Sequence, residues 1–193
     1  MKQLPKKLYH VSLDLNHPGI FDLRVPESRM KDEDSVTPRI CVSDSIEGCL
    51  TASAFGAHYL GESLMETDDL MKVFVIDTEK LGLTSSDVIF PTELYQSGKV
   101  DDANLTNEYW ILKDFVVPQE DQLVVKVTGF DDGNWEPFWS YEERQYMDSL
   151  DIDRSDYDVV EEAYYEKYQT EFPSFCIIKD VTFDIVSNEL ASA

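Results

Sequence analysis

Short apolar segments place the strongest limit on what this chain can fold into. Six runs rich in Val, Ile, Leu, Phe and Tyr are each bounded by turn-forming residues, a pattern typical of β-strands. No apolar run approaches the roughly 20 residues that a membrane-spanning helix needs, so we expect no membrane association. The predicted strands are residues 6–13, 39–43, 71–78, 107–118 and 122–130, the last two separated by a turn at Pro118. Residues 174–186 predict either a final strand pair or one long bent strand.

Helical patterns are fewer. The motif SDS supplies capping side chains for a helix over residues 45–61, in which Ile46, Leu50, Ala54 and Ala57 recur at helical spacing. The acidic stretch 141–168 predicts one or two further helices, and residues 88–95 (VIFPTELY) predict a strand edge followed by a turn. Several strands, one early helix and late acidic helices favour an α+β fold over an alternating parallel sheet.

Nothing in the sequence marks a sharp domain boundary. A chain of 193 residues suits one domain, and the softest break is the turn-rich stretch 129–137 (GFDDGNWEP). We therefore predict a single domain over 1–193, with a core over 6–128. An acidic helical extension over 129–193 ends in a strand that we expect to rejoin that core.

The net charge of the chain favours some classes of binding partner over others. Thirty-nine acidic residues against sixteen basic ones give a net charge of −23, which repels phosphate backbones and argues against direct nucleic-acid binding. The start of the chain is near neutral, whereas residues 131–171 carry fourteen acidic and three basic residues. Such a surface is either a means of staying in solution or a match for a basic protein patch.

The cysteines and the N-terminal segment indicate a cellular compartment. Three cysteines are scattered without metal-ligand spacing, which predicts a reducing environment and no structural zinc. The start, MKQLPKKLYHVSLDL, lacks the apolar stretch of a secretory signal. We expect a cytoplasmic protein.

Three polar residues stand at predicted strand ends, where a side chain can reach a cleft. His10 ends the first strand, Ser43 ends the second, and Glu108 begins a later one. A histidine can bond a ribose hydroxyl, and a carboxylate can stabilise the positive charge that develops when a group leaves an anomeric carbon. The alternative is that His10, next to Tyr9, is structural.

These segments together resemble the ADP-ribosyltransferase-like fold. LYHVS is similar to its first-strand motif, RICVSDSIEGCLTA to its second motif, and KVFVIDTEKLGL to the strand that follows. NEYWILKDFVVPQEDQLVVKV resembles the third motif, in which a glutamate opens a strand that turns at a proline. The order and spacing fit across residues 6–128.

The resemblance implies a split β-sheet cleft that binds NAD. His10 matches the histidine that holds a ribose in diphtheria-toxin-like and poly(ADP-ribose) polymerase-like members, and Glu108 matches the catalytic glutamate. Ser43 and Ser12 match hydroxyl positions of the second and first motifs. Val11 stands where a glycine is common, and the second-motif helix lacks the expected stacking tyrosine.

Positive charges are scarce in this acidic chain, and Arg24, Arg29 and Arg39, which all precede the second motif, are candidates for binding pyrophosphate. Guanidinium groups bind phosphate through paired hydrogen bonds, which makes Arg24 and Arg39 the preferred candidates. The alternative is that they pair with local acids such as Glu27 or Asp34.

Three functions compete at this stage. The first is NAD-dependent ADP-ribosyl transfer to a protein or other acceptor, with release of nicotinamide. The second is a non-catalytic acidic protein that occupies a basic, nucleic-acid-binding surface of a partner, as in phage–host conflict. The third, removal of a 2′-phosphate from RNA, is disfavoured because that substrate needs a basic groove.

Overall fold

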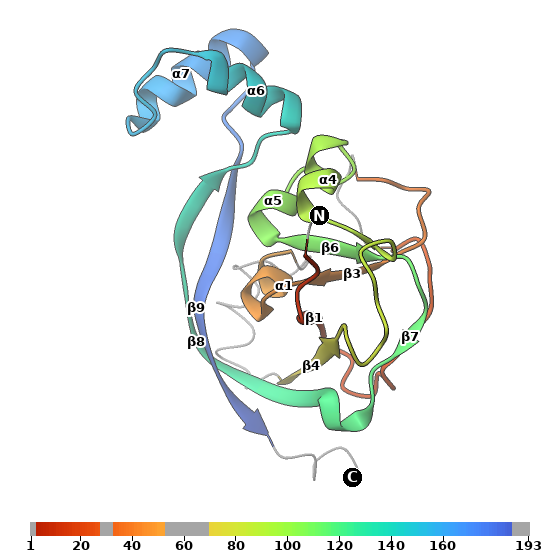
Figure 1. The fold of residues 1–193 in the computed structure, drawn as a ribbon. Helices are drawn as coiled ribbons and strands as arrows, with labels where there is room; N and C mark the ends of the chain where they lie inside the picture. The colour runs from red at the N-terminus through yellow and green to blue at the C-terminus, as the bar shows by residue number, and fades with distance from the viewer. Residues whose placement is uncertain (1–2, 28–32, 53–69, 187–193) are drawn as a thin grey trace.

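The computed structural model describes residues 3–27, 33–52 and 70–186, and it is mixed α+β with an antiparallel main sheet (Figure 1). In sheet order the strands are β5 (Val88–Ile89), β6 (Glu108–Ile111), β3 (Ile40–Ser43), β1 (Lys7–Ser12), β4 (Leu70–Asp77), β8 (Gln122–Pro137) and β9 (Ser174–Val186). A second sheet pairs β2 (Ile20–Phe21) with β7 (Phe115–Val116). The α+β prediction is confirmed. Across the described ranges, no helix is long and apolar enough to cross a membrane.

The main sheet buries apolar side chains on both faces because residues alternate along each strand. One face carries Leu8, Phe74 and Ile76 in a cluster that extends to Phe115. The other carries Val73 and Val125, which pack with Leu50. Helix α1 (Ile46–Ala52) covers this second face beside β1 and β9. The predicted helix therefore forms at its start, and positions 53–61, with Ala54 and Ala57, lie outside the described residues.

Helix α1 sits unusually close to the strand before it. The Ser45 hydroxyl accepts a hydrogen bond from the Gly48 amide, which caps the helix as the SDS motif predicts. A Cβ atom at Gly48 would lie 2.1 Å from the Ser43 hydroxyl oxygen and 2.3 Å from the Thr106 carbonyl oxygen. Glycine at this position thus allows the helix to approach the strand end that carries Ser43.

Two short helices replace the turn predicted around Pro91. After β5, helix α4 (Pro91–Gln96) begins with Pro91 in its first turn, and helix α5 (Ala103–Thr106) follows. A proline at the start of a helix loses no internal hydrogen bond, and the Glu93 carboxylate accepts from the Phe90 amide. For residues 88–95 the predicted strand edge is confirmed as β5, but the turn after it was wrong because Pro91 was used only as a strand breaker. A four-residue helix such as α5 leaves almost no periodicity to detect.

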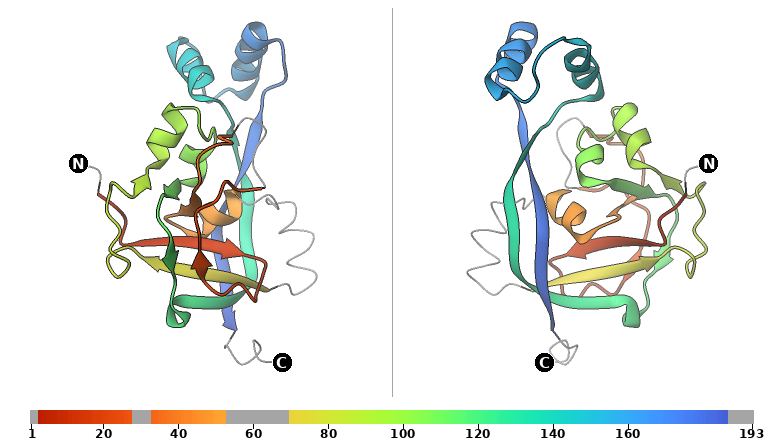
Figure 2. Two further views of the ribbon diagram at one scale, coloured as in Figure 1. Left: turned by 90° about the vertical axis from the view of Figure 1, so that its right-hand side faces the viewer. Right: turned by 60° about the vertical axis from the view of Figure 1, so that its left-hand side comes forward.

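Strands β8 and β9 form a long arm that carries a separate helical lobe. The strands pair from Val124 with Val186 to Pro137 with Ser174. Beyond that pair, residues 138–173 form the α6–α7 lobe, built from α6 (Tyr141–Ser149) and α7 (Tyr157–Tyr168). Figures 1 and 2 show this lobe standing at one end of the sheet, beyond α4. The prediction of one or two helices in 141–168 is confirmed as two.

The boundary expected between residues 128 and 129 falls inside β8, which runs unbroken past it. Gly129 marks a shift of register with β9. The last apolar run forms one long strand at the sheet edge, so the chain returns to the main sheet after the lobe.

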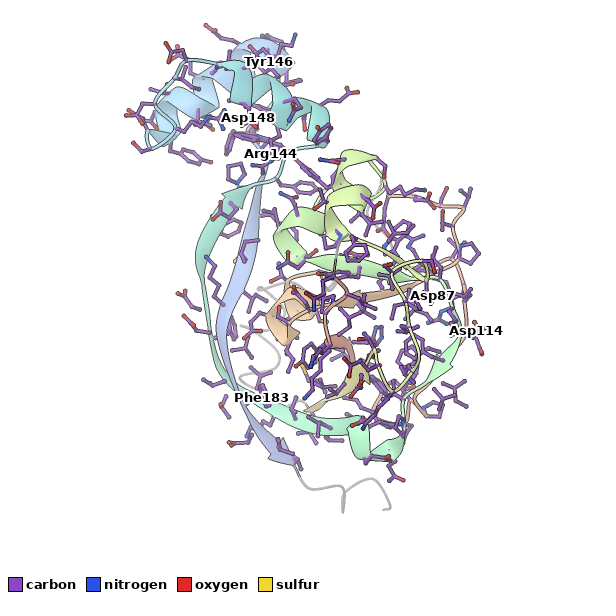
Figure 3. The ribbon with its side chains drawn as sticks, viewed as in Figure 1. Asp87, Asp114, Arg144, Tyr146, Asp148 and Phe183 are labelled. Atoms are coloured by element: carbon purple, nitrogen blue, oxygen red, sulfur yellow. The ribbon has the colours of Figure 1, made fainter. Side chains whose placement is uncertain are left out.

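The α6–α7 lobe has its own core and a polar anchor to helix α4. Trp139 packs face to face with Tyr164 and edge-on to Phe172. The Tyr95 hydroxyl of α4 donates toward the Trp139 and Ser140 carbonyls and accepts from Nε of Arg144 at 2.8 Å. Arg144 is labelled at the lobe side of this anchor in Figure 3.

Candidate functional site

The main sheet opens between β1 and β3. These strands share a single register pair, Tyr9 with Ser43, whereas β3 and β6 pair along their whole length and β1 and β4 do so over six residues. Beyond Tyr9 the two strands separate, and the gap between them is a wedge in the sheet. The wedge lies between the strands that carry His10 and Ser43, where the motifs predict a cleft.

His10 lies in that wedge. Its Nδ1 donates to the Cys41 carbonyl oxygen at 2.9 Å, in place of a backbone hydrogen bond between the strands. Phe21 and Phe74 pack around the ring. Burial lowers the pKa of His10, the Cys41 carbonyl opposes this, and the charges of His17 and Arg24 lower it further. The imidazole is therefore neutral, and its Nε2 is left as a hydrogen-bond acceptor.

Strand alternation positions Glu108 opposite the wedge. Ser43 pairs with Glu108 and Cys41 pairs with Trp110, so these four side chains share one face. The Trp110 indole N–H donates to Oε1 of Glu108 at 2.7 Å, and the Cys41 thiol also bonds this carboxyl group. The left-handed Asn107, at φ 49°, ends α5 and turns the chain into β6.

The carboxyl group of Glu108 is buried, with 8% of the residue exposed. Burial raises its pKa to about 7, and the charge of Asp102 adds to the rise. Hydrogen bonds from Trp110 and Cys41 oppose the rise, and the charge of Glu33 adds to it. Asp102 is itself buried, and this burial raises its pKa to about 6. Glu108 therefore exchanges its proton near neutral pH.

Two cavities meet at His10 and Glu108. A small cavity of about 160 Å³ has mostly apolar walls, contributed by side chains such as Val11, Val42 and Ala52. A larger cavity of about 640 Å³ has polar walls that include Ser12, His17, Arg24 and Asp22. Both cavities are lined by His10, Cys41, Ala52 and Glu108. His10 and Glu108 thus lie at one junction. By strand alternation their side chains leave the sheet on opposite faces.

The two arginines have different environments. Arg39 is fully buried: its guanidinium lies 3.9 Å from the centre of the Trp110 ring, pairs with Glu33 and donates to the Asp34 and Thr37 carbonyls. This is the local pairing weighed against a phosphate role. Arg24 is exposed at the larger cavity, and within the described ranges no hydrogen bond or ion pair holds its side chain. Arg24 therefore remains the candidate for binding an anion.

The two serines also differ. Ser43 lines the small cavity, but its hydroxyl donates to the Thr106 carbonyl at 2.8 Å and so ties β3 to α5. Ser12 lines the larger cavity, where its hydroxyl accepts from the Asp14 amide and keeps its own proton to donate. Ser12 is the better placed of the two to contact a ligand.

Sequence reasoning missed Glu33, Cys41 and Asp102 as parts of the site. Glu33 stands in the charged MKDED stretch, which has no periodicity. Cys41 was considered only for metal or disulfide spacing. The one available signal was strand alternation, because pairing RICVS with NEYWI places Cys41 on the face of Glu108.

Comparisons with known proteins add no identification. No family model, no curated protein and no solved structure matches this chain. The resemblance to ADP-ribosyltransferases therefore remains a prediction from the motifs.

Proposed function

We propose that this chain has an ADP-ribosyltransferase-like split sheet, cleaves NAD between nicotinamide and ribose, and transfers the ADP-ribose to an acceptor. The observation that carries the proposal is the junction of the two cavities at His10 and Glu108. An apolar space of about 160 Å³ is large enough for a six-membered ring. The larger polar cavity has room for ribose and phosphate, so a bond that joins ring to ribose would lie beside the carboxyl group.

Each residue of the junction has a chemical task in this proposal. Nε2 of His10 accepts a hydrogen bond from a ribose hydroxyl, and ionised Glu108 stabilises the positive charge that develops on the sugar. The C1′–nitrogen bond breaks, and its electron pair leaves with nicotinamide. The acceptor then forms a bond to C1′ and gives its proton to the Glu108 carboxylate. Arg24 binds phosphate at the open end.

Nicotinamide release from NAD tests the proposal. We expect release by the wild type and a loss of at least about 100-fold in Glu108→Gln, because the neutral amide cannot stabilise the sugar cation. Glu120→Gln removes one carboxylate from an exposed position and is the matched control. Arg24→Ala should raise KM more than it lowers kcat. No release by the wild type, or equal release by Glu108→Gln, would sink the catalytic claim.

A second candidate function rests on the α6–α7 lobe. Residues 138–173 hold eleven acidic and three basic residues, a net charge of −8. Exposed Tyr157 and Tyr165 lie among these charges, and tyrosines are frequent anchors at protein interfaces. The alternative proposal is that this lobe binds a basic protein surface that otherwise holds nucleic acid.

Salt dependence separates this alternative from general charge attraction. The probe is a lysine-rich peptide, with binding measured at low and high salt. We expect the triple change of Glu161, Glu162 and Glu166 to Gln to weaken binding more than a matched change of exposed Glu79, Glu120 and Asp184 to their amides. Equal weakening of peptide binding by the two triple variants would show that the lobe has no specific role in binding.

A further inference from the structure

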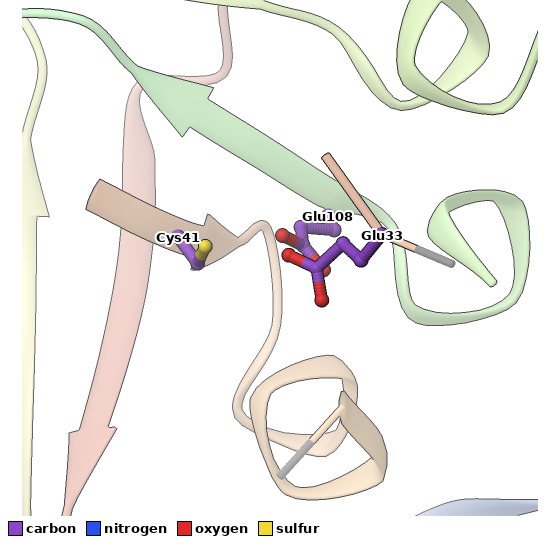
Figure 4. A group of neighbouring side chains, drawn as sticks. All are labelled: Glu33, Cys41 and Glu108. Carbon is purple, nitrogen blue, oxygen red and sulfur yellow. The ribbon is translucent and has the colours of Figure 1, made fainter. Parts of the chain in front are cut away.

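A second carboxyl group lies against Glu108. Glu33 reaches it from the loop before β3, and a carboxylate oxygen of Glu33, one of Glu108 and Sγ of Cys41 all lie within 4.8 Å of one another. Figure 4 shows the two glutamates side by side, with Cys41 next to them on β3. Glu33 lines the larger cavity together with Glu108.

Arg39 holds Glu33 in this position. Its Nη2 donates to Oε1 of Glu33, and its Nη1 donates to the carbonyl oxygens of Asp34 and Thr37, which fixes the loop. The guanidinium packs on the Trp110 ring, whose N–H bonds Glu108. One arginine and one tryptophan thus join the two carboxyl groups into one unit.

The charges in this unit do not balance when every acid is ionised. Glu108 faces Glu33 from the loop, Cys41 from β3 and Asp102 from the start of α5, and the buried cation beside them is Arg39. Lys99 lies farther out and pairs with Asp34 at 2.6 Å. Two carboxylates this close in a buried site cannot both ionise at low cost, so one of them retains a proton.

We propose that Glu33 is a positioning residue for Glu108: held as a carboxylate by Arg39, it keeps the shared proton of the pair on Glu108 in the absence of substrate. That proton passes to solvent before the Glu108 carboxylate meets the developing charge. The inference rests on the proposed function, because Glu108 is the group that meets the developing charge. Glu33 forms the ion pair with Arg39, so the proton resides on its neighbour. Burial and the charges of Asp102 and Glu33, which raise the pKa of Glu108 to about 7, agree with this assignment.

A metal ion is the competing explanation for the same spacing. Three ligand atoms within 4.8 Å are close enough to share a cation. However, the Arg39 guanidinium already contacts Glu33, and burial followed by the charge of Glu108 raises the pKa of the Cys41 thiol well above its usual range. Both features oppose a divalent cation at this point.

Carbon-detected NMR of the glutamate carboxyl groups tests the inference without substrate. The Glu108 signal is assigned by its loss in Glu108→Gln and titrated in wild type, Glu33→Gln and the control Glu120→Gln. We expect Glu33→Gln to lower the apparent pKa of Glu108 by about one unit, the effect of removing one nearby charge. Glu33→Asp keeps the charge and should give a smaller shift.

The outcomes are distinct. An unchanged Glu108 titration in Glu33→Gln, or an equal shift in Glu120→Gln, overturns the inference, as does stoichiometric Zn²⁺ binding by the wild type that Glu33→Gln abolishes. Urea unfolding midpoints confirm that each variant is folded. The turnover assay adds a second check, because the pH midpoint of kcat/KM, which reports groups of the free enzyme, should fall by the same unit in Glu33→Gln.

Failure of the proposed function is recognisable separately. If the NMR shift is seen and no nicotinamide is released, the position of Glu33 stands and the catalytic role of Glu108 falls. If nicotinamide is released with the same pH midpoint in Glu33→Gln, the catalytic role stands and the role of Glu33 falls.

Discussion

The cavity between β1 and β3 and the α6–α7 lobe use the same residue types in different settings. Both combine acidic side chains with a buried tryptophan, Trp110 beside Glu108 and Trp139 in the core of the lobe. At the cavity, Glu108 is buried and bonded to Trp110 and to Cys41 of β3, and Asp102 is buried nearby, whereas lobe acids such as Glu161 and Glu162 are exposed to solvent. Most of the charge of the lobe is therefore hydrated, whereas burial raises the pKa of Glu108 to about 7 and that of Asp102 to about 6.

The largest expected effect is the loss of the lobe without loss of the cavity. Trp139→Ala removes the ring that packs on Tyr164 and Phe172, which costs about 3–5 kcal/mol. We expect fast amide hydrogen exchange in α6 and α7 and unchanged protection in β1, β3 and β6. Loss of protection throughout the sheet would show that the two regions unfold as one unit.

A smaller effect is expected from pH, and it should come from the cavity. The raised pKa of Glu108, about 7 against 4.5, gives stability that is present below the unfolded value and lost as the pH rises through the folded value. Between pH 5 and pH 8 the free energy of unfolding should fall by about 2–3 kcal/mol through this group. Asp102 acts in the same direction.

Urea unfolding at several pH values measures this fall. Glu108→Gln should flatten the pH dependence and leave the variant more stable than wild type at pH 8. The matched variant Glu162→Gln, in the lobe, should keep the wild-type slope. A wild-type slope in Glu108→Gln would place the titrating group elsewhere.

The anchor between the two regions should give an effect of about 1–2 kcal/mol. Tyr95→Phe removes the hydroxyl that contacts the Trp139 and Ser140 carbonyls and Arg144. We expect faster exchange of the α6 amides and an unchanged rate of nicotinamide release. A reduced rate of release would mean that the lobe contributes to the site.

The smallest effect concerns the exposed acids of the lobe. Asp158→Asn or Glu162→Gln should change the free energy of unfolding by less than about 0.5 kcal/mol, because both side chains are in water. Thermal unfolding at low and high salt checks this. A larger change would show that the hydrated charges are part of the folding energetics.

Local patterns in the sequence predicted most strands and the lobe helices, because apolar runs and acidic helical stretches are properties of neighbouring residues. The predictions failed where structure depends on distant partners. Arg39 and Arg24 look alike in sequence and both line the larger cavity, yet Arg39 is buried on Trp110 and Arg24 is exposed. The nearness of Glu33 to Glu108 requires a loop to fold across two strands, which no spacing along the chain expresses.

The pairing of Pro137 with Ser174 closes the tip of the β8–β9 arm. The entire lobe leaves the sheet and returns to it across this one pair, so a short turn joining the two positions would leave an ordinary hairpin and the same strand order. The tip is therefore a natural place for insertion or exchange of sequence. Changes there would alter which partners the molecule contacts without altering the strand pairing of its main sheet.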